Sequence, residues 1–301
     1  MSLTALLKND GEIKSLFSTL PNFKNLFKTL NDDGIPFPQS LTPLADLVDG
    51  ANAANVGMAY DYWLRAYIQR INHDEGEPEL VADRSIERIP FGLAEHDLEH
   101  LLPQITEKYH ASKEIRKQFS AGISVIEQDL YEACTFLGYI EDYIRSGRIR
   151  ENGYDVNPHE VVDLSQLASR TQEVAHVFRK QSRVLYNPSF GAMSNLVGGA
   201  DADFVIDDML VDIKTVRRFG YQIEHVRQLI GYYILAKFDN DFPVVIDKLG
   251  IFFSRFNRFV FVTIEDIQTG FDLEGFSKKF IDILQKRREK DVQNRLRKLG
   301  F

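Results

Sequence analysis

The chain has 301 residues, of which 44% are hydrophobic, and its formal net charge is −8 at pH 7. This length allows one large domain or two ordinary ones, and the composition is sufficient for a hydrophobic core. The one cysteine, Cys134, excludes a disulfide framework and a four-cysteine iron–sulfur cluster. There is no basic start followed by an apolar core and no apolar run of membrane-spanning length, so we expect a cytoplasmic protein without a membrane partner.

The part of the chain before residue 190 is predicted to be mainly helical, because its apolar residues recur at helical spacing. Helices are expected over residues 3–30 with a break near Pro21, over 54–71, over 113–145 as one or two helices, and over 165–180. Ser165 is the predicted N-cap of the last of these. Residues 186–195 are predicted to form a loop that leads to the next elements.

A β-hairpin is predicted at residues 202–213. Two short runs rich in apolar and β-branched residues, 202–206 and 209–213, flank Asp207-Asp208, which is typical of a tight turn. This turn places Asp203 opposite Asp212. Gly198 and Gly199 precede the hairpin, and their lack of side chains would leave room for a close backbone or a substrate strand.

Four charged side chains fall on one face of this hairpin, because successive residues of a strand point to opposite faces. They are Asp201, Asp203, Asp212 and Lys214, with Asp201 expected opposite Lys214. Directly opposed residues have Cβ atoms about 4.5–5.5 Å apart, so three carboxylates at this density repel one another. A divalent cation would convert that repulsion into a binding site.

A helix is predicted over residues 221–238, after the hairpin. Its apolar stripe contains Ile223, Val226, Ile230 and Ile234, and His225, Gln228 and Tyr232 lie on another face. Two further strands are expected at 249–254 and 258–264, joined near Asn257.

An aspartate, a short hairpin and then Asp-x-Lys resemble the PD-(D/E)XK nuclease superfamily. In this resemblance Asp203 is the first acid, Asp212 the second and Lys214 the lysine. The pair Gln228 and Tyr232 looks like the Gln-x-x-x-Tyr motif of the RecB-like branch, which lies on the helix after the catalytic hairpin. The resemblance covers residues 186–264, and residues 54–70 more loosely.

The resemblance implies an α/β fold: a restriction-endonuclease-like core, with a mixed central sheet flanked by helices, and a large helical N-terminal portion or insertion. The expected organisation is an N-terminal helical segment at 1–53, a helical region at 54–180 that contains a first core helix at 54–71, the nuclease core at 181–270 and a basic C-terminal helix at 271–301. The implied activity is hydrolysis of phosphodiester bonds in DNA rather than RNA. A protein partner or a homo-oligomer is left undetermined.

The implied cofactor is Mg²⁺ or Mn²⁺, held by Asp203, Asp212 and the Ile213 carbonyl. Lys214 would orient or help deprotonate the attacking water, and Gln228 and Tyr232 would position the lysine or the substrate strand. Three residues are alternatives for a further acidic ligand: Asp201, Asp61 and Glu173.

The choice between Asp61 and Glu173 decides the domain organisation. RecB-like nucleases often have a glycine followed by a metal-binding histidine on the first core helix, whereas here Gly57 is followed by Asp61. Other members take a glutamate from a helix before the first strand, and Glu173 has that place. With Asp61 as ligand, residues 72–180 form an insertion in one nuclease domain. With Glu173, the N-terminal half is a separate module.

Nucleic-acid contacts are expected from residues that flank the hairpin and from the following helix: Arg217, Arg218, His225 and Arg227. The segment 275–301 has nine basic residues and three acidic ones. It is interpreted as the solvated face of a terminal helix or as a DNA contact. Phe276, Phe280, Ile283 and Leu284 indicate that the first half of this helix packs on the body of the protein.

Two other functions are consistent with the sequence. The first is a catalytically silent nucleic-acid-binding or interaction module on the same fold. The second, more remote, is a zinc metallopeptidase, because His96-x-x-Glu99-His100 matches the His-x-x-Glu-His signature. That motif requires both histidines on one face of a helix.

Overall fold

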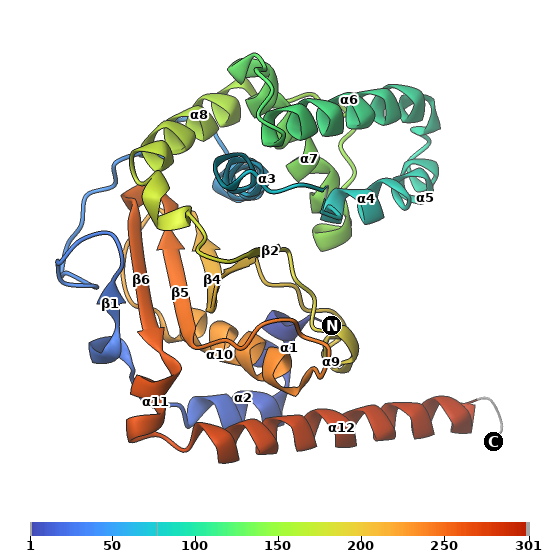
Figure 1. The fold of residues 1–301 in the computed structure, drawn as a ribbon. Helices are drawn as coiled ribbons and strands as arrows, with labels where there is room; N and C mark the ends of the chain where they lie inside the picture. The colour runs from blue at the N-terminus through green and yellow to red at the C-terminus, as the bar shows by residue number, and fades with distance from the viewer. Residues whose placement is uncertain (1, 77, 299–301) are drawn as a thin grey trace.

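The computed structural model describes residues 2–76 and 78–298, and it has an α/β fold in which a mixed sheet is flanked by helices (Figure 1). Residues 299–301 of the expected C-terminal helix lie outside the described residues, as do the side chains of Arg295 and Lys298. A mainly helical region stands over one face of the sheet, and the first and last helices, at residues 3–18 and 273–298, lie on the other side (Figure 1).

Within the described residues, six strands form one sheet in the order β1-β6-β5-β4-β3-β2. The strands are β1 Lys28–Thr29, β2 Val184–Tyr186, β3 Phe204–Ile206, β4 Met209–Lys214, β5 Lys248–Phe253 and β6 Arg258–Thr263. Only the pair β4 and β5 is parallel within this sheet. Parallel neighbours need a crossover connection, and here the helix α10 (Ile223–Phe238) provides it.

The predicted hairpin is present with the expected register. Phe204 pairs with Val211 and Ile206 with Met209 around a turn in which Asp207 has a positive φ of 53°. The ladder is shorter than predicted, because β3 begins only at Phe204. The Asp203 carboxylate accepts a hydrogen bond from the Ile213 N–H at 2.5 Å, so a side chain takes the place of the next main-chain contact. The prediction that Asp201 pairs with Lys214 is wrong, since Asp201 forms a β-bridge with Ser189.

The two faces of the sheet belong to two hydrophobic clusters, because alternate side chains of each strand point in opposite directions. Val205, Leu210, Leu249, Ile251, Val260 and Val262 belong to one cluster. Phe204, Ile206, Val211, Phe252 and Phe259 belong to the other. The sheet is therefore buried on both sides, which explains why its strands are almost continuously apolar.

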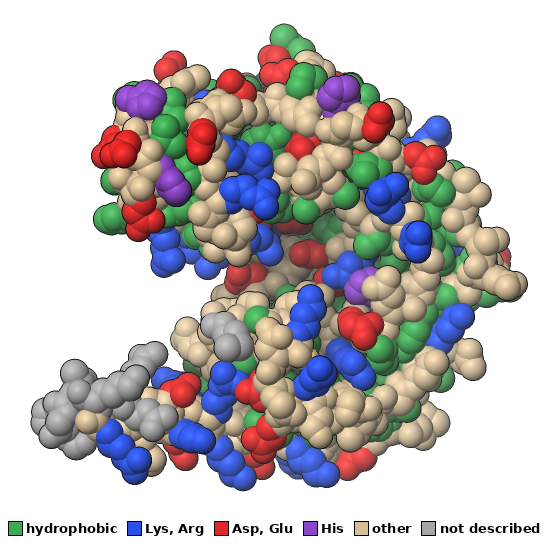
Figure 2. Space-filling view, turned by 180° about the vertical axis from the view of Figure 1, so that it is seen from behind, with side chains coloured by type: hydrophobic (Ala, Val, Ile, Leu, Met, Phe, Trp, Pro, Cys, Tyr) green, Lys and Arg blue, Asp and Glu red, His purple; other side chains and the backbone are tan. Residues whose placement is uncertain are grey.

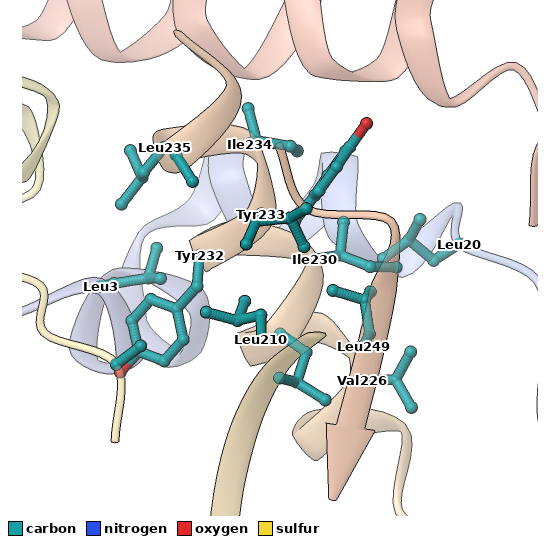
Figure 3. Packing of buried hydrophobic residues seen from close by; sticks show 14 of the residues in the cluster. Leu3, Leu20, Leu210, Val226, Ile230, Tyr232, Tyr233, Ile234, Leu235 and Leu249 are labelled. Atoms are coloured by element: carbon teal, nitrogen blue, oxygen red, sulfur yellow. The ribbon is translucent and has the colours of Figure 1, made fainter. Parts of the chain in front are cut away.

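The first cluster joins the sheet to α10, the N-terminal helices and the C-terminal helix. Besides α10, the helices on this side of the sheet are α1 Leu3–Asn9, α2 Gly11–Ser18, α9 Gly191–Leu196, α11 Ile264–Gly270 and α12 Leu273–Lys298. Figure 3 shows Val226 and Ile230 of α10 packed close to Leu210 and Leu249 of the sheet, with Leu3 beside α10. The prediction that α12 packs through its first half is confirmed, since Phe276, Phe280 and Leu284 are buried and Ile283 is half-buried.

The second cluster joins the sheet to the helical region. Its α-helices are α3 Ala53–Asn72, α4 Val81–Ile86, α5 Ile89–Glu95, α6 Leu102–Ser120, α7 Glu127–Ser146 and α8 Pro158–Glu173. Short 3₁₀ helices lie at Lys24–Leu26, Glu99–Leu101, Ala175–Phe178 and Ser254–Phe256. Helix α7 crosses α3 closely at Gly138, where an added Cβ would lie 3.1 Å from the Ala59 nitrogen. This contact fixes the part of α3 that leads to the cavity described below.

A buried ion pair ties the helical region to the sheet. Both guanidinium ends of Arg255, in the turn between β5 and β6, donate to the Asp163 carboxylate of α8 at 2.8 Å. The two side chains are 1% and 0% exposed. Because an unpaired charge at this depth is costly, the pair holds α8 in one position against the sheet.

Three further local predictions are wrong. Residues 21–30 do not form an α-helix, because Lys24–Leu26 form a short 3₁₀ helix and Lys28–Thr29 form β1. Ser165 lies inside α8 and its hydroxyl donates to the Val162 carbonyl, because Asn157 caps the helix and Pro158 begins it. Residues 186–195 are not a simple loop, since β2 ends at Tyr186 and α9 begins at Gly191. Among the described residues, no helix combines the length and apolarity that crossing a membrane requires.

Candidate functional site

A cavity of about 770 Å³ opens between the helical region and the hairpin. Figure 2 shows a deep notch in the molecule with acidic and basic side chains at its inner end. The polar side chains that line the cavity include Asp61, Arg84, Arg88, Arg145, Asn187, Asp201, Asp203, Asp212, Lys214, Gln228 and Tyr232. The cavity therefore contains all five predicted catalytic residues.

The hairpin supplies the floor of this cavity. Asp203 lies just before β3, and Asp212, Ile213 and Lys214 form the end of β4. Asp212 is only 4% exposed, because the sheet and the surrounding helices cover it on every side except the cavity. Gly198 and Gly199 also line the cavity with φ of 73° and 113°. Since an added Cβ at Gly199 would meet nothing within 4 Å, its backbone conformation, not crowding, favours glycine.

A chain of polar contacts connects β4 to α10. The Lys214 ammonium lies 2.7 Å from the Asp212 carboxylate and donates to Gln228 Oε1 at 3.1 Å. Gln228 in turn donates to the Tyr232 hydroxyl at 3.0 Å. Gln228 and Tyr232 are one turn apart on α10, so a helix packed on the sheet presents both to the end of β4. Gln228 therefore contacts the lysine directly, and Tyr232 contacts Gln228.

Of the alternative acids, the structure brings Asp61 and Asp201 to the cavity. Asp61 is on α3 and pairs with Arg65 one turn later, and its side chain keeps 18% of its surface exposed to the cavity. Asp201 pairs with Arg84 at 3.4 Å. Glu173 does not reach the cavity. It lies at the end of α8, is exposed, and pairs with Arg170 at 2.8 Å.

Crowding of the carboxylates shifts their protonation. Burial raises the pKa of Asp61 to about 7, with Arg65 opposing the shift and Asp203 adding to it. Burial likewise raises the pKa of Asp212 to about 6, opposed by Lys214 and reinforced by Asp203. Burial acts to lower the pKa of Lys214, but Asp212 and Asp203 outweigh it and raise the value. Lys214 is therefore a permanent cation in the neutral pH range.

The donor set of the cavity fits a hard divalent cation. One buried oxygen of Asp61 (Oδ1) and one of Asp212 (Oδ2) make no hydrogen bond, although Asp212 Oδ2 has its ion pair with Lys214. Among the described residues no three His, Cys, Asp or Glu side chains are close enough to form a ready metal cage. Mg²⁺ does not need one, because it keeps several waters and binds through one or two carboxylates together with substrate phosphates.

The residues expected to contact nucleic acid do not line the cavity. Arg217 and Arg218 are exposed after β4, and Arg227 donates to the Phe17 carbonyl at 3.1 Å, which ties it to α2. His225 is half-buried, and burial together with the charge of Lys214 lowers its pKa to about 4. These side chains lie on the hairpin side of the protein but outside the cavity. They were predicted from their positions near the hairpin, and local sequence does not define where the opposite wall of the cavity stands.

Sequence analysis missed the basic side chains of that opposite wall, which are Arg84, Arg88 and Arg145. Arg84 is on α4 and Arg88 precedes α5, two short helices that were not predicted. Arg84 and Arg88 are four residues apart, which weakly indicates a shared helical face. Only the packing of the helical region reveals that this face is turned toward Asp203 and Asp212.

The histidine motif does not form a zinc site. His96 ends α5, Asp97 has a positive φ of 57°, and His100 lies in a separate 3₁₀ helix. The two histidines therefore do not share the helical face that the motif requires.

Comparison of the chain with protein-family models, with curated proteins and with solved structures found no match in any of the three.

Proposed function

We propose that this protein is a divalent-metal-dependent nuclease that hydrolyses phosphodiester bonds in DNA, with a restriction-endonuclease-like core of the RecB-like branch. One observation supports this above all: the contacts Asp212–Lys214–Gln228–Tyr232 run along the wall of a cavity that also contains Asp61 and Asp203. Folding does not require several carboxylates in one cavity, whereas metal-assisted phosphodiester chemistry uses them to hold the cation.

The residues of the cavity have distinct roles in this proposal. Asp203 and Asp212 would hold Mg²⁺ or Mn²⁺, with the Ile213 carbonyl and either Asp61 or Asp201 as further donors. The bound cation supplies Lewis-acid stabilisation of the phosphate and activation of water. Lys214 would orient the attacking water or help deprotonate it, and would donate hydrogen bonds to the phosphate. Gln228 holds the ammonium at 3.1 Å and Tyr232 holds Gln228.

A cleavage assay tests the proposal. Purified protein is incubated with labelled single-stranded DNA, duplex DNA and RNA in Mg²⁺ or Mn²⁺ and in EDTA. We expect metal-dependent cleavage of DNA that falls at least 100-fold in Asp212→Asn and in Lys214→Ala, since each removes an electrostatic contribution to the transition state. The matched control is Asp208→Asn in the same hairpin, whose carboxylate pairs with Lys248 on the surface.

Two results would refute nuclease activity. The first is inert wild-type protein on every substrate, and the second is Asp212→Asn cleaving as fast as the wild type. A silent nucleic-acid-binding module is the second candidate, because Arg65 and Lys214 already neutralise Asp61 and Asp212 and no ready metal cage exists among the described residues. DNA binding without cleavage in Mn²⁺ would favour that candidate.

A further inference from the structure

The two walls of the cavity differ in charge. The hairpin side presents three carboxylates and Lys214, and the helical region presents Arg84, Arg88 and Arg145 beside Asp61, which is paired with Arg65. We propose that the helical region is a phosphate clamp that admits one DNA strand, so that the substrate is single-stranded DNA or a frayed end and not a continuous duplex. This inference rests on the proposed nuclease function and assigns to it a substrate class and substrate-binding residues.

The arginines are placed to bind phosphate. Arg84 has 48% of its side chain exposed, and its two ion pairs are long, at 3.6 Å to Glu79 and 3.4 Å to Asp201. Exposed pairs of this kind contribute less than about 1 kcal/mol, so a phosphate can displace them. A guanidinium also binds two phosphate oxygens at once, which favours arginine over lysine at such a site.

Arg145 is held in place by a buried partner. It pairs with Glu141, whose side chain is 1% exposed and also accepts a hydrogen bond from the Tyr62 hydroxyl at 2.7 Å. The Arg145 side chain nevertheless keeps 60% of its surface exposed. It is therefore anchored on one side and open to the cavity on the other. Next to it, Ile144 is 37% exposed and offers an apolar contact to an unstacked base.

The size of the cavity selects a single strand. A volume of about 770 Å³ lies within the range of about 300–1,000 Å³ that holds small ligands, which is room for a nucleotide or two. The major groove of a duplex is by itself about 12 Å wide and about 8.5 Å deep, so a segment of double helix is larger than this volume. The pair Arg84–Asp201 connects the two walls, and the helical region would have to move away before a duplex could reach Asp212.

Binding measured without metal separates this inference from catalysis. Fluorescence anisotropy in EDTA compares a labelled single-stranded oligonucleotide with the same sequence as a blunt duplex, for the wild type and for Arg84→Ala/Arg88→Ala. The control is Arg148→Ala/Arg170→Ala, which removes the same charge from exposed arginines that do not line the cavity. Circular dichroism confirms that each variant is folded.

We expect the wild type to prefer the single strand at least 10-fold, and the Arg84/Arg88 variant to lose at least 10-fold in affinity while the control does not. Each lost phosphate contact lowers the salt dependence of single-strand binding by about 0.7 in log–log slope, so the slope should fall by about 1.4. Equal affinity for the blunt duplex, or equal losses in both variants, would overturn the clamp. Cleavage of blunt duplex that is unaffected by Arg84→Ala/Arg88→Ala would overturn the clamp and leave the nuclease standing. If only Arg84→Ala/Arg88→Ala lost single-strand binding and the wild type did not cleave DNA in Mn²⁺, the clamp would stand and the nuclease would be refuted.

Discussion

Replacing Asp61 by asparagine should change how the stability of this protein depends on pH. Burial raises the pKa of Asp61 from its ordinary 3.8 to about 7. Above pH 4 the unfolded chain has released this proton while the folded chain still holds it. Unfolding therefore releases a proton, and the folded state loses stability as the pH rises toward 7. Above about pH 8 Asp61 is ionised in both states, and this contribution no longer changes.

The size of the effect follows from the shift. The slope approaches about 1.4 kcal/mol per pH unit near pH 5 and weakens as the pH nears 7, where Asp61 is half ionised, so its contribution falls by about 2 kcal/mol from pH 5 to 7. Asparagine has nearly the same shape and can still accept a hydrogen bond from Arg65, but it does not titrate. Changes in packing and hydrogen bonding caused by the substitution displace the stability of Asp61→Asn by the same amount at every pH, so the difference in slope remains measurable.

Urea denaturation in EDTA at pH 5, 6, 7 and 8 measures the two slopes. Trp63 is the only tryptophan, is 1% exposed and lies on the same helix as Asp61, so its fluorescence reports unfolding of this region. Between pH 5 and 7 we expect the wild type to lose about 2 kcal/mol relative to Asp61→Asn. A stability difference that stays constant from pH 5 to 8 would refute the assignment of a raised pKa to this carboxyl. Added Mg²⁺ should stabilise the wild type by about 2.7 kcal/mol when its concentration is 100 times its Kd. A fixed concentration of Mg²⁺ should stabilise the wild type more above pH 7 than below it.

Two further predictions concern the framework around the cavity. Asp163→Ala should destabilise the protein by about 3–5 kcal/mol in urea denaturation, because Arg255 would be left buried without its partner, whereas Asp208→Ala on the surface should cost less than about 1 kcal/mol. Comparable losses in the two variants would contradict this account of the buried pair. Gly199→Ala should lower the unfolding free energy by about 1–3 kcal/mol because of its φ of 113°, while Gly11→Ala at the start of α2, where an added Cβ also meets nothing, should be neutral or slightly stabilising. An unchanged melting temperature for Gly199→Ala would show that this conformation is not needed.

The hairpin and the helix after it were predictable because their signals are local. The turn at Asp207-Asp208 defines the register of β3 and β4, and period-two alternation then brings Asp203, Asp212 and Lys214 together. Helical periodicity likewise places Gln228 and Tyr232 on one face of α10. The same reasoning failed at Asp201 and at Ser165, where a side-chain hydrogen bond and an earlier cap decided the local structure.

Only the tertiary structure decided which distant residues complete the cavity. Asp61 and Glu173 are both acids on predicted helices, and no pattern in their own segments separates them. Packing of α7 on α3 at Gly138, and of α3 within the second hydrophobic cluster, turns Asp61 into the cavity, while Glu173 is left at the exposed end of α8. The basic wall has the same origin, since Arg84, Arg88 and Arg145 face the hairpin only because of how the helical region stands on the sheet. Periodicity determines which face of an element a side chain occupies, whereas burial of apolar surface between elements determines what that face meets.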